Sequence, residues 1–575
     1  MKRIDTVAAW IGAAMVILAV GCADSSMGGA ALTLGDADSV NSSTTDGTKG
    51  GLDGGASWDG EFEATATAQD SSETPTDESS GWKGGGIGLT LPGAQNTGKF
   101  RAQVAAGKVP QPSDFPMAGW LNEHHAVLPP ANPANDVDLH PIASLHSTAT
   151  GATEVLLQLG LNTSKTLQEL QPPVAMVLLV DKSGSLGVAG WQTLQQQIPQ
   201  IAERLPEGSW LSVVGFSSGA ETAWPMAAWH SWQTKALGVA VQGMEMGDGT
   251  DLYVGVEGAL KELAKAPPAF VQRRVLLISD GAITKGEHTP TDVVELAKGS
   301  KASFSTVAYG MDAQVKLLEK LALVTSGTSY SAVSPAALVD ALSKHVATLL
   351  VAVAENLGVR LKLSAGWKVV EYYELPLVEQ GDTLTLGDSA NQQGSTDVSA
   401  GASDASQPSQ DTVMNPPDVK FKSVYPASHN GLIVLKIAPP AGLTLSTSTD
   451  LIAAKVDWTY ALTKNHVPKS HESAIKVLGL VAIPDGGYEY FSHPEARRTY
   501  AIVTAGEALK AAVVAAAAGK VKDGQAKLNA AATLVAATIV AVDVKTADPA
   551  GDLADAQSLL AKLAENLNAL GAKAP

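Results

Sequence analysis

The sequence predicts an α/β protein with a doubly wound, mostly parallel sheet, followed by an antiparallel β-sandwich and a helical C-terminal region. Between residues 174 and 354, apolar β-branched runs alternate with segments of helical periodicity, which is typical of parallel sheets covered by helices. Beyond residue 355 the strand signals have a period of two and no helices between them. From about residue 493 the chain is rich in alanine and has helical spacing.

Within the α/β region, each expected element has its own signal. Short continuous apolar runs predict buried strands, and longer stretches with apolar residues three and four apart predict helices. The predicted strands are 174–180, 210–216, 274–279 and 303–309, and the predicted helices are 191–205, 252–263, 291–298, 314–324 and 335–354.

Two strands are expected before this region, and five follow it. We expect the first two to pair with the later ones, so that the α/β unit is inserted into the sandwich. The earlier strands are 140–146 and 153–161, and the later ones are 358–363, 368–373, 432–437, 452–462 and 474–482.

The C-terminal helices should be interrupted near Gly519–Gly524 and Asp548–Gly551. Two alanine-rich runs, Ala508–Ala518 and Ala530–Val542, are predicted to be buried helices and not membrane spans, because each run is short and charged residues lie between them.

Composition shifts divide the chain into six segments. Residues 23–95 and 388–416 are rich in small polar residues, which cannot offset the entropy of ordering, so both are predicted to be disordered. The predicted segments are a lipoprotein signal peptide at 1–22, a disordered tether at 23–95, an N-terminal segment at 96–171 that joins the sandwich, the α/β domain at 172–355, the sandwich at 356–484 with its insert at 388–416, and the helical region at 485–575.

The charge balance excludes one class of partner. The chain has 58 acidic and 40 basic residues, a net charge of −18, and no basic stretch interleaved with aromatic residues. Nucleic acid is therefore not expected as a partner. No Gly-x-x-x-x-Gly-Lys loop is present, so nucleotide binding is not expected either.

The N-terminal residues have the pattern of an export signal. Lys2 and Arg3 precede the apolar run Val7–Val20, which is short for a membrane span. Small residues lead into Cys22, the only cysteine of the chain, and this junction resembles the lipobox of bacterial lipoproteins. The resemblance implies a lipid anchor on Cys22 in the bacterial cell envelope, facing the periplasm or the exterior. The resemblance also implies the outer membrane over the inner one, since many such lipoproteins are sorted by the residue after the cysteine, which here is Ala23 and not Asp. The alternative is an ordinary signal peptide.

Three polar loops are expected at one edge of the parallel sheet. Asp181–Ser185 (Asp-Lys-Ser-Gly-Ser) follows the first strand, Gly247–Leu252 precedes a helix, and Ser279–Gly281 ends another strand. Open α/β sheets bind ligands at the carboxyl ends of their strands. Carboxylate and hydroxyl oxygens suit a hard divalent cation such as Mg²⁺, which leads us to expect a metal site there.

These loops resemble the metal-ion-dependent adhesion site (MIDAS) of the von Willebrand factor A (VWA) family, over roughly residues 172–355. The resemblance implies that Ser183, Ser185 and Thr250 bind the metal through their hydroxyls, and that Asp181 and Asp280 bind it directly or through water. The ion would be Mg²⁺, or else Ca²⁺ or Mn²⁺, and its open position would take an Asp or Glu carboxylate of a protein partner. The stretch after the domain resembles, more loosely, bacterial VWA proteins likened to calcium-activated chloride channels and inter-alpha-trypsin inhibitor heavy chains.

The expected function is therefore non-catalytic adhesion or interaction through the metal. One alternative is a scaffold or accessory subunit of an envelope complex with a mainly structural ion, and another is that the loops are plain polar turns, with Thr250 capping the next helix. Gly215–Gly219 fits the Gly-x-Ser-x-Gly pattern, which would make Ser217 a hydrolase nucleophile, but no helical periodicity follows it. His124 and His471 lack the spacing of a zinc site.

Overall fold

The computed structural model describes most of the chain beyond residue 86. Cys22, the predicted signal peptide and the 388–416 insert lie outside the described residues. The described residues are 87–124, 128–147, 153–372, 377–380, 383–386, 420–427, 431–440, 451–465, 468–477, 490–491, 494–542 and 547–571.

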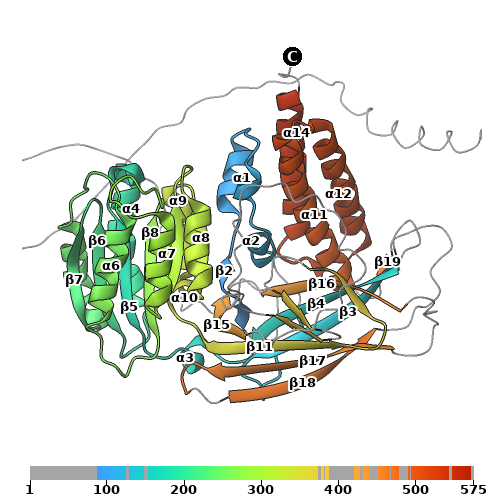
Figure 1. Cartoon of the computed structure of the whole chain (residues 1–575), viewed down its shortest axis with the longest axis horizontal. Coiled ribbons are helices and arrows are strands. Elements are labelled where there is room, and N and C mark those ends of the chain that lie inside the picture. Colours follow the sequence, from blue (N-terminus) through green and yellow to red (C-terminus); the bar gives the residue numbers. More distant parts are fainter. Residues whose placement is uncertain are drawn as a thin grey trace, which may run out of the picture. The chain divides into compact units, whose positions relative to one another are not determined.

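A seven-stranded, mostly parallel sheet forms the centre of the α/β domain (Figure 1). Its strands lie in the order β2-β10-β9-β8-β5-β6-β7, and β7 runs antiparallel to β6, while the other pairs are parallel. The strands are β2 (Gly93–Ala94), β5 (Ala175–Asp181), β6 (Trp210–Phe216), β7 (Ala220–Ala228), β8 (Arg273–Ser279), β9 (Ser303–Tyr309) and β10 (Thr328–Ala332).

Helices cover both faces of this sheet, because successive side chains of its strands point to opposite faces. In β5, Met176 and Leu178 pack with residues of α4, α5 and α9, whereas Val177 and Leu179 pack with α6, α7 and α8. The predicted doubly wound arrangement is confirmed. The helices of this domain are α4 (Gly187–Glu203), α5 (Thr234–Gln242), α6 (Leu252–Leu263), α7 (Pro290–Gly299), α8 (Val315–Val324), α9 (Pro335–Lys344) and α10 (Val346–Leu350).

The prediction of one continuous helix over 335–354 is wrong beyond Lys344. α9 ends at Lys344, His345 has a non-helical φ of −108°, and only the short α10 follows. Val351 already has extended backbone angles, and the amide of Val353 donates to the carbonyl of Val424. The β-branched residues after α10 therefore join a sheet instead of prolonging the helix.

The remaining strands form an antiparallel sheet of twelve strands (Figure 1). As expected, strands on the two sides of the α/β domain pair with each other, since β4 lies beside β16 and β1 beside β15. The strands are β1 (Ile87–Thr90), β3 (Asp138–Ser147), β4 (Thr153–Thr163), β11 (Ala354–Leu363), β12 (Lys368–Tyr372), β13 (Leu377–Gln380), β14 (Thr383–Leu386), β15 (Lys420–Ala427), β16 (Leu432–Ala438), β17 (Leu451–Leu462), β18 (Pro468–Val477) and β19 (Tyr490–Phe491).

This sheet replaces the two separate sheets of the expected sandwich. Its β4–β16 part and its β11–β17 part nevertheless share one core, in which Leu157 and Leu159 pack with Leu361 and Val456. Leu156 of β4 precedes Leu157 and points to the opposite face of the strand, where it packs in a second core with the C-terminal helices. β1 and β2 also lie within the segment predicted as a tether, so the ordered structure begins before residue 96.

Three long C-terminal helices, α11 (Pro494–Ala517), α12 (Val521–Ala541) and α14 (Asp552–Gly571), pack side by side (Figure 1). The shorter helices α1 (Gly98–Ala105) and α2 (Met117–Asn122) contribute to the same core, and α3 (Leu167–Leu170) precedes β5. Among the described helices, α11 is long and apolar enough to cross a membrane, although half of its most apolar window is buried in the protein. Burial of this kind is typical of a core helix.

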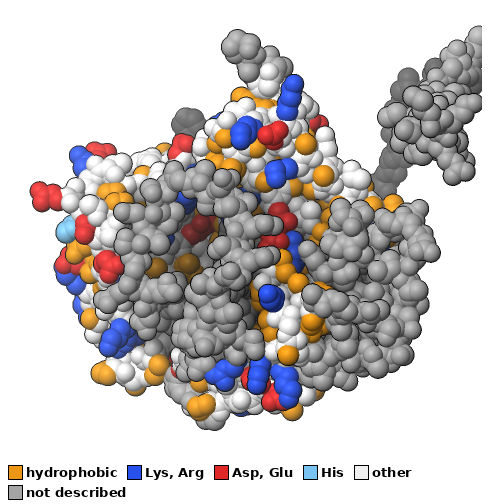
Figure 2. All heavy atoms as spheres, turned by 45° about the vertical axis from the view of Figure 1, so that its right-hand side comes forward, with side chains coloured by type: hydrophobic (Ala, Val, Ile, Leu, Met, Phe, Trp, Pro, Cys, Tyr) orange, Lys and Arg blue, Asp and Glu red, His pale blue; other side chains and the backbone are white. Residues whose placement is uncertain are grey.

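The described surface has few large exposed apolar side chains. On the face drawn in Figure 2, hydrophobic side chains are scattered among polar and charged ones. The most exposed are Val540, Trp232 and Val239. Single exposed hydrophobic residues are normal and do not indicate a binding surface.

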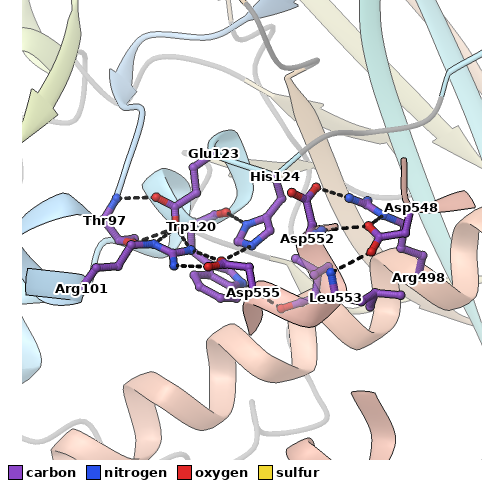
Figure 3. Close-up of polar contacts among 11 residues, drawn as sticks. Thr97, Arg101, Trp120, Glu123, His124, Arg498, Asp548, Asp552, Leu553 and Asp555 are labelled. Atoms are coloured by element: carbon purple, nitrogen blue, oxygen red, sulfur yellow. Dashed lines mark hydrogen bonds and ion pairs between the residues drawn. The ribbon is translucent and has the colours of Figure 1, made fainter. Parts of the chain in front are cut away.

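Ion pairs join α1 to α14, and a buried arginine joins α11 to the start of α14 (Figure 3). Arg101 of α1 contacts Glu123, which follows α2, and the half-exposed Asp555 of α14, each at 2.7 Å. In the same region Arg498, buried in α11, pairs with Asp548 and with Asp552. The pairs of Arg498 satisfy charges that would be costly to bury alone.

Candidate metal site

The three predicted loops meet at the carboxyl edge of the parallel sheet. Asp181 is the last residue of β5, and Asp280 directly follows the neighbouring strand β8. Thr250 lies in the loop before α6. A parallel bridge between Ser183 and Gly247 ties the first loop to the second.

The first loop turns its oxygen atoms towards one another. Asp181 is fully buried, and its Oδ1 accepts a hydrogen bond of 2.8 Å from the amide of Ser183. The hydroxyl oxygens of Ser183 and Ser185 lie 2.9 Å apart. The second carboxylate oxygen, Oδ2, accepts a bond of 2.7 Å from the hydroxyl of Ser279, the residue before Asp280. The first and third loops therefore share a side-chain hydrogen bond.

The second loop is joined to the third through backbone bonds. Thr250 is 1% exposed, and its amide donates to the hydroxyl of Thr284 at 2.8 Å. Its carbonyl accepts from the amides of Thr284 and Lys285, at 3.0 and 3.1 Å. Thr250 is thus held beside the segment that follows Asp280.

Asp280 is itself fixed by its neighbours. Its Oδ1 accepts from the amide of Ala282 at 2.9 Å, and its carbonyl accepts from the amide of Gln314 at 2.6 Å. It is 8% exposed. The buried carboxylates of Asp181 and Asp280 therefore lie near one another, and the hydroxyl groups of the three loops lie beside them.

Burial raises the pKa of Asp181 to about 6, against the opposing effect of hydrogen bonds from Ser183 and Ser279, and the negative charge of Asp280 raises it further. A carboxylate in such surroundings is stabilised by a bound cation, which compensates both the burial and the repulsion. The donors are two carboxylates and three hydroxyls, which suit a hard cation such as Mg²⁺. Among the described residues no cluster of three or more His, Cys, Asp or Glu side chains offers a second metal site.

The alternative in which Thr250 caps α6 is wrong. The N-cap residue is Asp251, whose Oδ1 accepts a bond of 3.1 Å from the amide of Val254. The backbone of Thr250 is already held by Thr284, so its side chain is not needed to begin the helix.

The surroundings of Ser217 do not match a hydrolase nucleophile elbow, which needs a helix after the serine. β7 follows instead, so the serine lies in a hairpin turn between antiparallel strands. Of the histidines considered for zinc, His124 is buried against the carbonyl of Trp120, and His471 stacks on Trp458 with ring centroids 5.3 Å apart.

Several residues that shape the site were not identified from the sequence. Ser279 was visible as the neighbour of Asp280, but nothing in the spacing showed its bond to Asp181. Thr284 and Gln314 hold the second and third loops from distant positions, and no local pattern marks them.

Comparison with known proteins identifies the family of the α/β domain. Residues 175–344 match the model of the von Willebrand factor type A domain family. No curated protein matches the chain significantly.

Among solved structures, the chain is similar to a von Willebrand factor type A protein from Catenulispora acidiphila, with 16% identity, 72% of this chain and 88% of that one covered, and a TM-score of 0.45. It is also similar to the ArnB paralog VWA2 from Sulfolobus acidocaldarius, with 15% identity, coverage of 75% and 98%, and a TM-score of 0.40. Proximal thread matrix protein 1 from the mussel byssus, with a zinc-occupied MIDAS motif, shares 17% identity over 31% of this chain and 48% of its own, with a TM-score of 0.28. None of these similarities assigns a metal or a partner to this chain. The family match and the fold together identify residues 175–344 as a von Willebrand factor type A domain.

Proposed function

We propose that this protein binds a protein partner through a divalent metal ion and catalyses no reaction. Asp181, Ser183, Ser185, Thr250 and Asp280 would hold the ion, which we take to be Mg²⁺, with Ca²⁺ or Mn²⁺ as substitutes. The VWA fold supports the proposal, because VWA domains commonly mediate protein interactions in this way. The partner would supply an Asp or Glu carboxylate to the ion.

The observation that carries the proposal is the pair of buried carboxylates at the sheet edge. Asp181 is fully buried and Asp280 is 8% exposed, yet within the described part of the chain neither carboxylate forms an ion pair with a Lys or Arg side chain. Buried carboxylates are normally paired with a cation or bound to a metal. A metal ion would supply the missing positive charge.

The chemistry of the donors also favours an open site. Two carboxylates nearly neutralise a divalent ion, whereas hydroxyls add no charge and leave it able to attract another anion. Ser185 is exposed at the rim, so solvent reaches this side of the site. An incoming carboxylate would displace a water molecule there.

Mn²⁺ is a probe that separates this function from a mainly structural ion. With the full chain loaded with Mn²⁺, we expect the water-proton relaxation rate to show exchangeable bound water, and to fall when a glutamate-containing peptide is added but not when its glutamine counterpart is added. An ion with no exchangeable water, whose removal by a chelator unfolds the domain, would instead support a scaffold with a structural metal. Binding of the peptide in excess chelator would contradict the proposal.

We further propose that the protein is exported in a bacterium and anchored in the cell envelope through a lipid on Cys22. The outer membrane is favoured over the inner membrane. Support comes from Lys2, Arg3, the apolar run and the single cysteine. Metabolic labelling with a fatty acid should mark the wild type and leave Cys22→Ser unlabelled. Equal labelling, or none in either protein, would contradict the anchor.

A further inference from the structure

The lysine inside the first metal loop is held unusually tightly. Lys182 lies between Asp181 and Ser183, yet its side chain is only 10% exposed. Its Nζ lies 2.8 Å from Oε2 of Glu221 in β7, and donates at 3.0 Å to the carbonyl of Glu245, which lies just before the second loop. Lysines are rarely buried unless they are paired, so this arrangement has a specific local cause.

The backbone of the same residue makes two more connections. The amide of Lys182 donates to the carbonyl of Phe216 at 2.8 Å, and its carbonyl accepts from the amide of Gly247 at 2.9 Å. Through backbone and side chain together, Lys182 joins the first loop to β6, to β7, to Gly247 of the second loop and to Glu245 just before it.

A glycine makes room for the lysine stem. A Cβ atom added at Gly215 would lie 3.3 Å from Cδ of Lys182 and 2.7 Å from the sulfur of Met244. The lysine stem therefore passes over β6 at Gly215, the only glycine of that strand, beside the buried Met244. Packing thus fixes the direction of the lysine, which limits the freedom of the loop that carries it.

We propose that Lys182 is a positioning residue of the metal site, which holds the loop of Asp181, Ser183 and Ser185 in register with the loop of Thr250. This inference rests on the proposed metal-binding function. Lys182 does not touch the metal; it acts by keeping the two sets of hydroxyl ligands at a fixed separation.

Two effects of Lys182 on metal affinity have opposite signs. Its positive charge repels a cation, so loss of that charge alone would tighten metal binding. Its bonds to Glu221 and to the carbonyl of Glu245 preorganise the loops, so their loss would weaken binding. Because Glu221 balances the charge of Lys182, we expect the positional effect to be the larger one.

The test is a calorimetric titration of Mg²⁺ into the full chain and its variants. We expect Lys182→Met to bind about 10- to 100-fold more weakly than the wild type, the range typical for partners that orient metal ligands. Lys182→Arg should recover part of the affinity, because it keeps both the charge and the donors. As a matched control, Lys261→Met removes an exposed lysine paired at 2.8 Å with Glu257 on α6, and should leave the affinity unchanged.

A second variant covers the case in which Lys182→Met fails to fold. Glu221 is 48% exposed on an edge strand, so Glu221→Gln should fold, and it too should weaken Mg²⁺ binding, because the lysine then loses its anchor and its balancing charge. Unchanged or tighter binding by Lys182→Met or by Glu221→Gln would overturn this inference alone. Absence of Mg²⁺ binding by the wild type would overturn the proposed function and this inference with it.

Discussion

Replacing Asp181 with asparagine should stabilise the metal-free domain at neutral pH while removing its response to metal. Burial and the nearby Asp280 raise the pKa of this carboxyl from 3.8 to about 6. The difference corresponds to about 3 kcal/mol of destabilisation when the group is ionised, at 1.36 kcal/mol per pH unit. The asparagine side chain of Asp181→Asn would carry no charge and could still bond to the hydroxyl of Ser279, which donates to Asp181 in the wild type.

The pH dependence follows from the direction of this pKa change. A carboxyl whose pKa is raised in the folded state contributes stability that is fully present below pH 3.8 and is lost as the pH rises through about 6. In excess chelator, the wild-type domain should therefore lose about 3 kcal/mol between pH 3 and pH 7 from this group. Asp181→Asn should not show that loss.

Calorimetric unfolding of the full chain in the presence of a chelator measures both effects. For a domain of this size, about 3 kcal/mol corresponds to a rise in Tm of roughly 6 to 12 °C for Asp181→Asn at pH 7.5, with little difference at pH 4. Mg²⁺ at a hundred times its Kd should add about 2.7 kcal/mol to the wild type and nothing to the variant. A variant less stable than the wild type at pH 7.5 in chelator, or stabilised equally by Mg²⁺, would refute this reasoning.

Substitutions at three further positions test individual side chains. Ser279→Ala removes the hydroxyl that orients the buried carboxylate of the first loop and should weaken Mg²⁺ binding about 10- to 100-fold in a calorimetric titration, without unfolding the domain. Thr250→Ala should also lower Mg²⁺ affinity, whereas Thr250→Ser, which keeps the hydroxyl, should bind nearly as the wild type does. Arg498→Met removes the buried cation that pairs with Asp548 and Asp552 and should destabilise the helical region by about 3 to 5 kcal/mol, measured by thermal unfolding; an unchanged Tm would contradict the importance of these ion pairs.

Where local signals were strong, the sequence predicted the fold closely. The helix expected at 252–263 has those bounds because its apolar residues recur with helical spacing and Asp251 caps it. Strands β6 and β9 also match their predicted ranges, since each is a short run rich in apolar and aromatic residues between turns.

Where tertiary contacts decide the structure, local patterns failed. The β10 segment Thr328–Ala332 has mostly small and polar residues, and it becomes a strand because β9 and β2 flank it on both sides. The strand expected at 474–482 instead runs over Pro468–Val477, where its register with β17 places it. The break expected at Gly519–Gly524 is shorter, because Gly524 lies inside α12 and packs closely against Ala512.

The candidate site, like the fold, was predictable only in part. Its proposed ligands were predictable because they stand in three short motifs at the ends of recognisable elements. The groups that hold them were not, because Ser279, Thr284 and Gln314 act through contacts between segments far apart in the sequence. Lys182 stood within the first motif, but its ion pair with Glu221 depends on β7, which was not predicted as a strand.

The most direct test of the central claim is a calorimetric titration of Mg²⁺ into the purified full chain beside its Asp181→Ala variant. We expect saturable binding at one site in the wild type and none in the variant. The fold of the variant should persist, because Asp181 is the last residue of β5 and lies at the end of the strand. Equal binding by both proteins would place any metal elsewhere, and no binding by either would contradict a metal-dependent function for this domain.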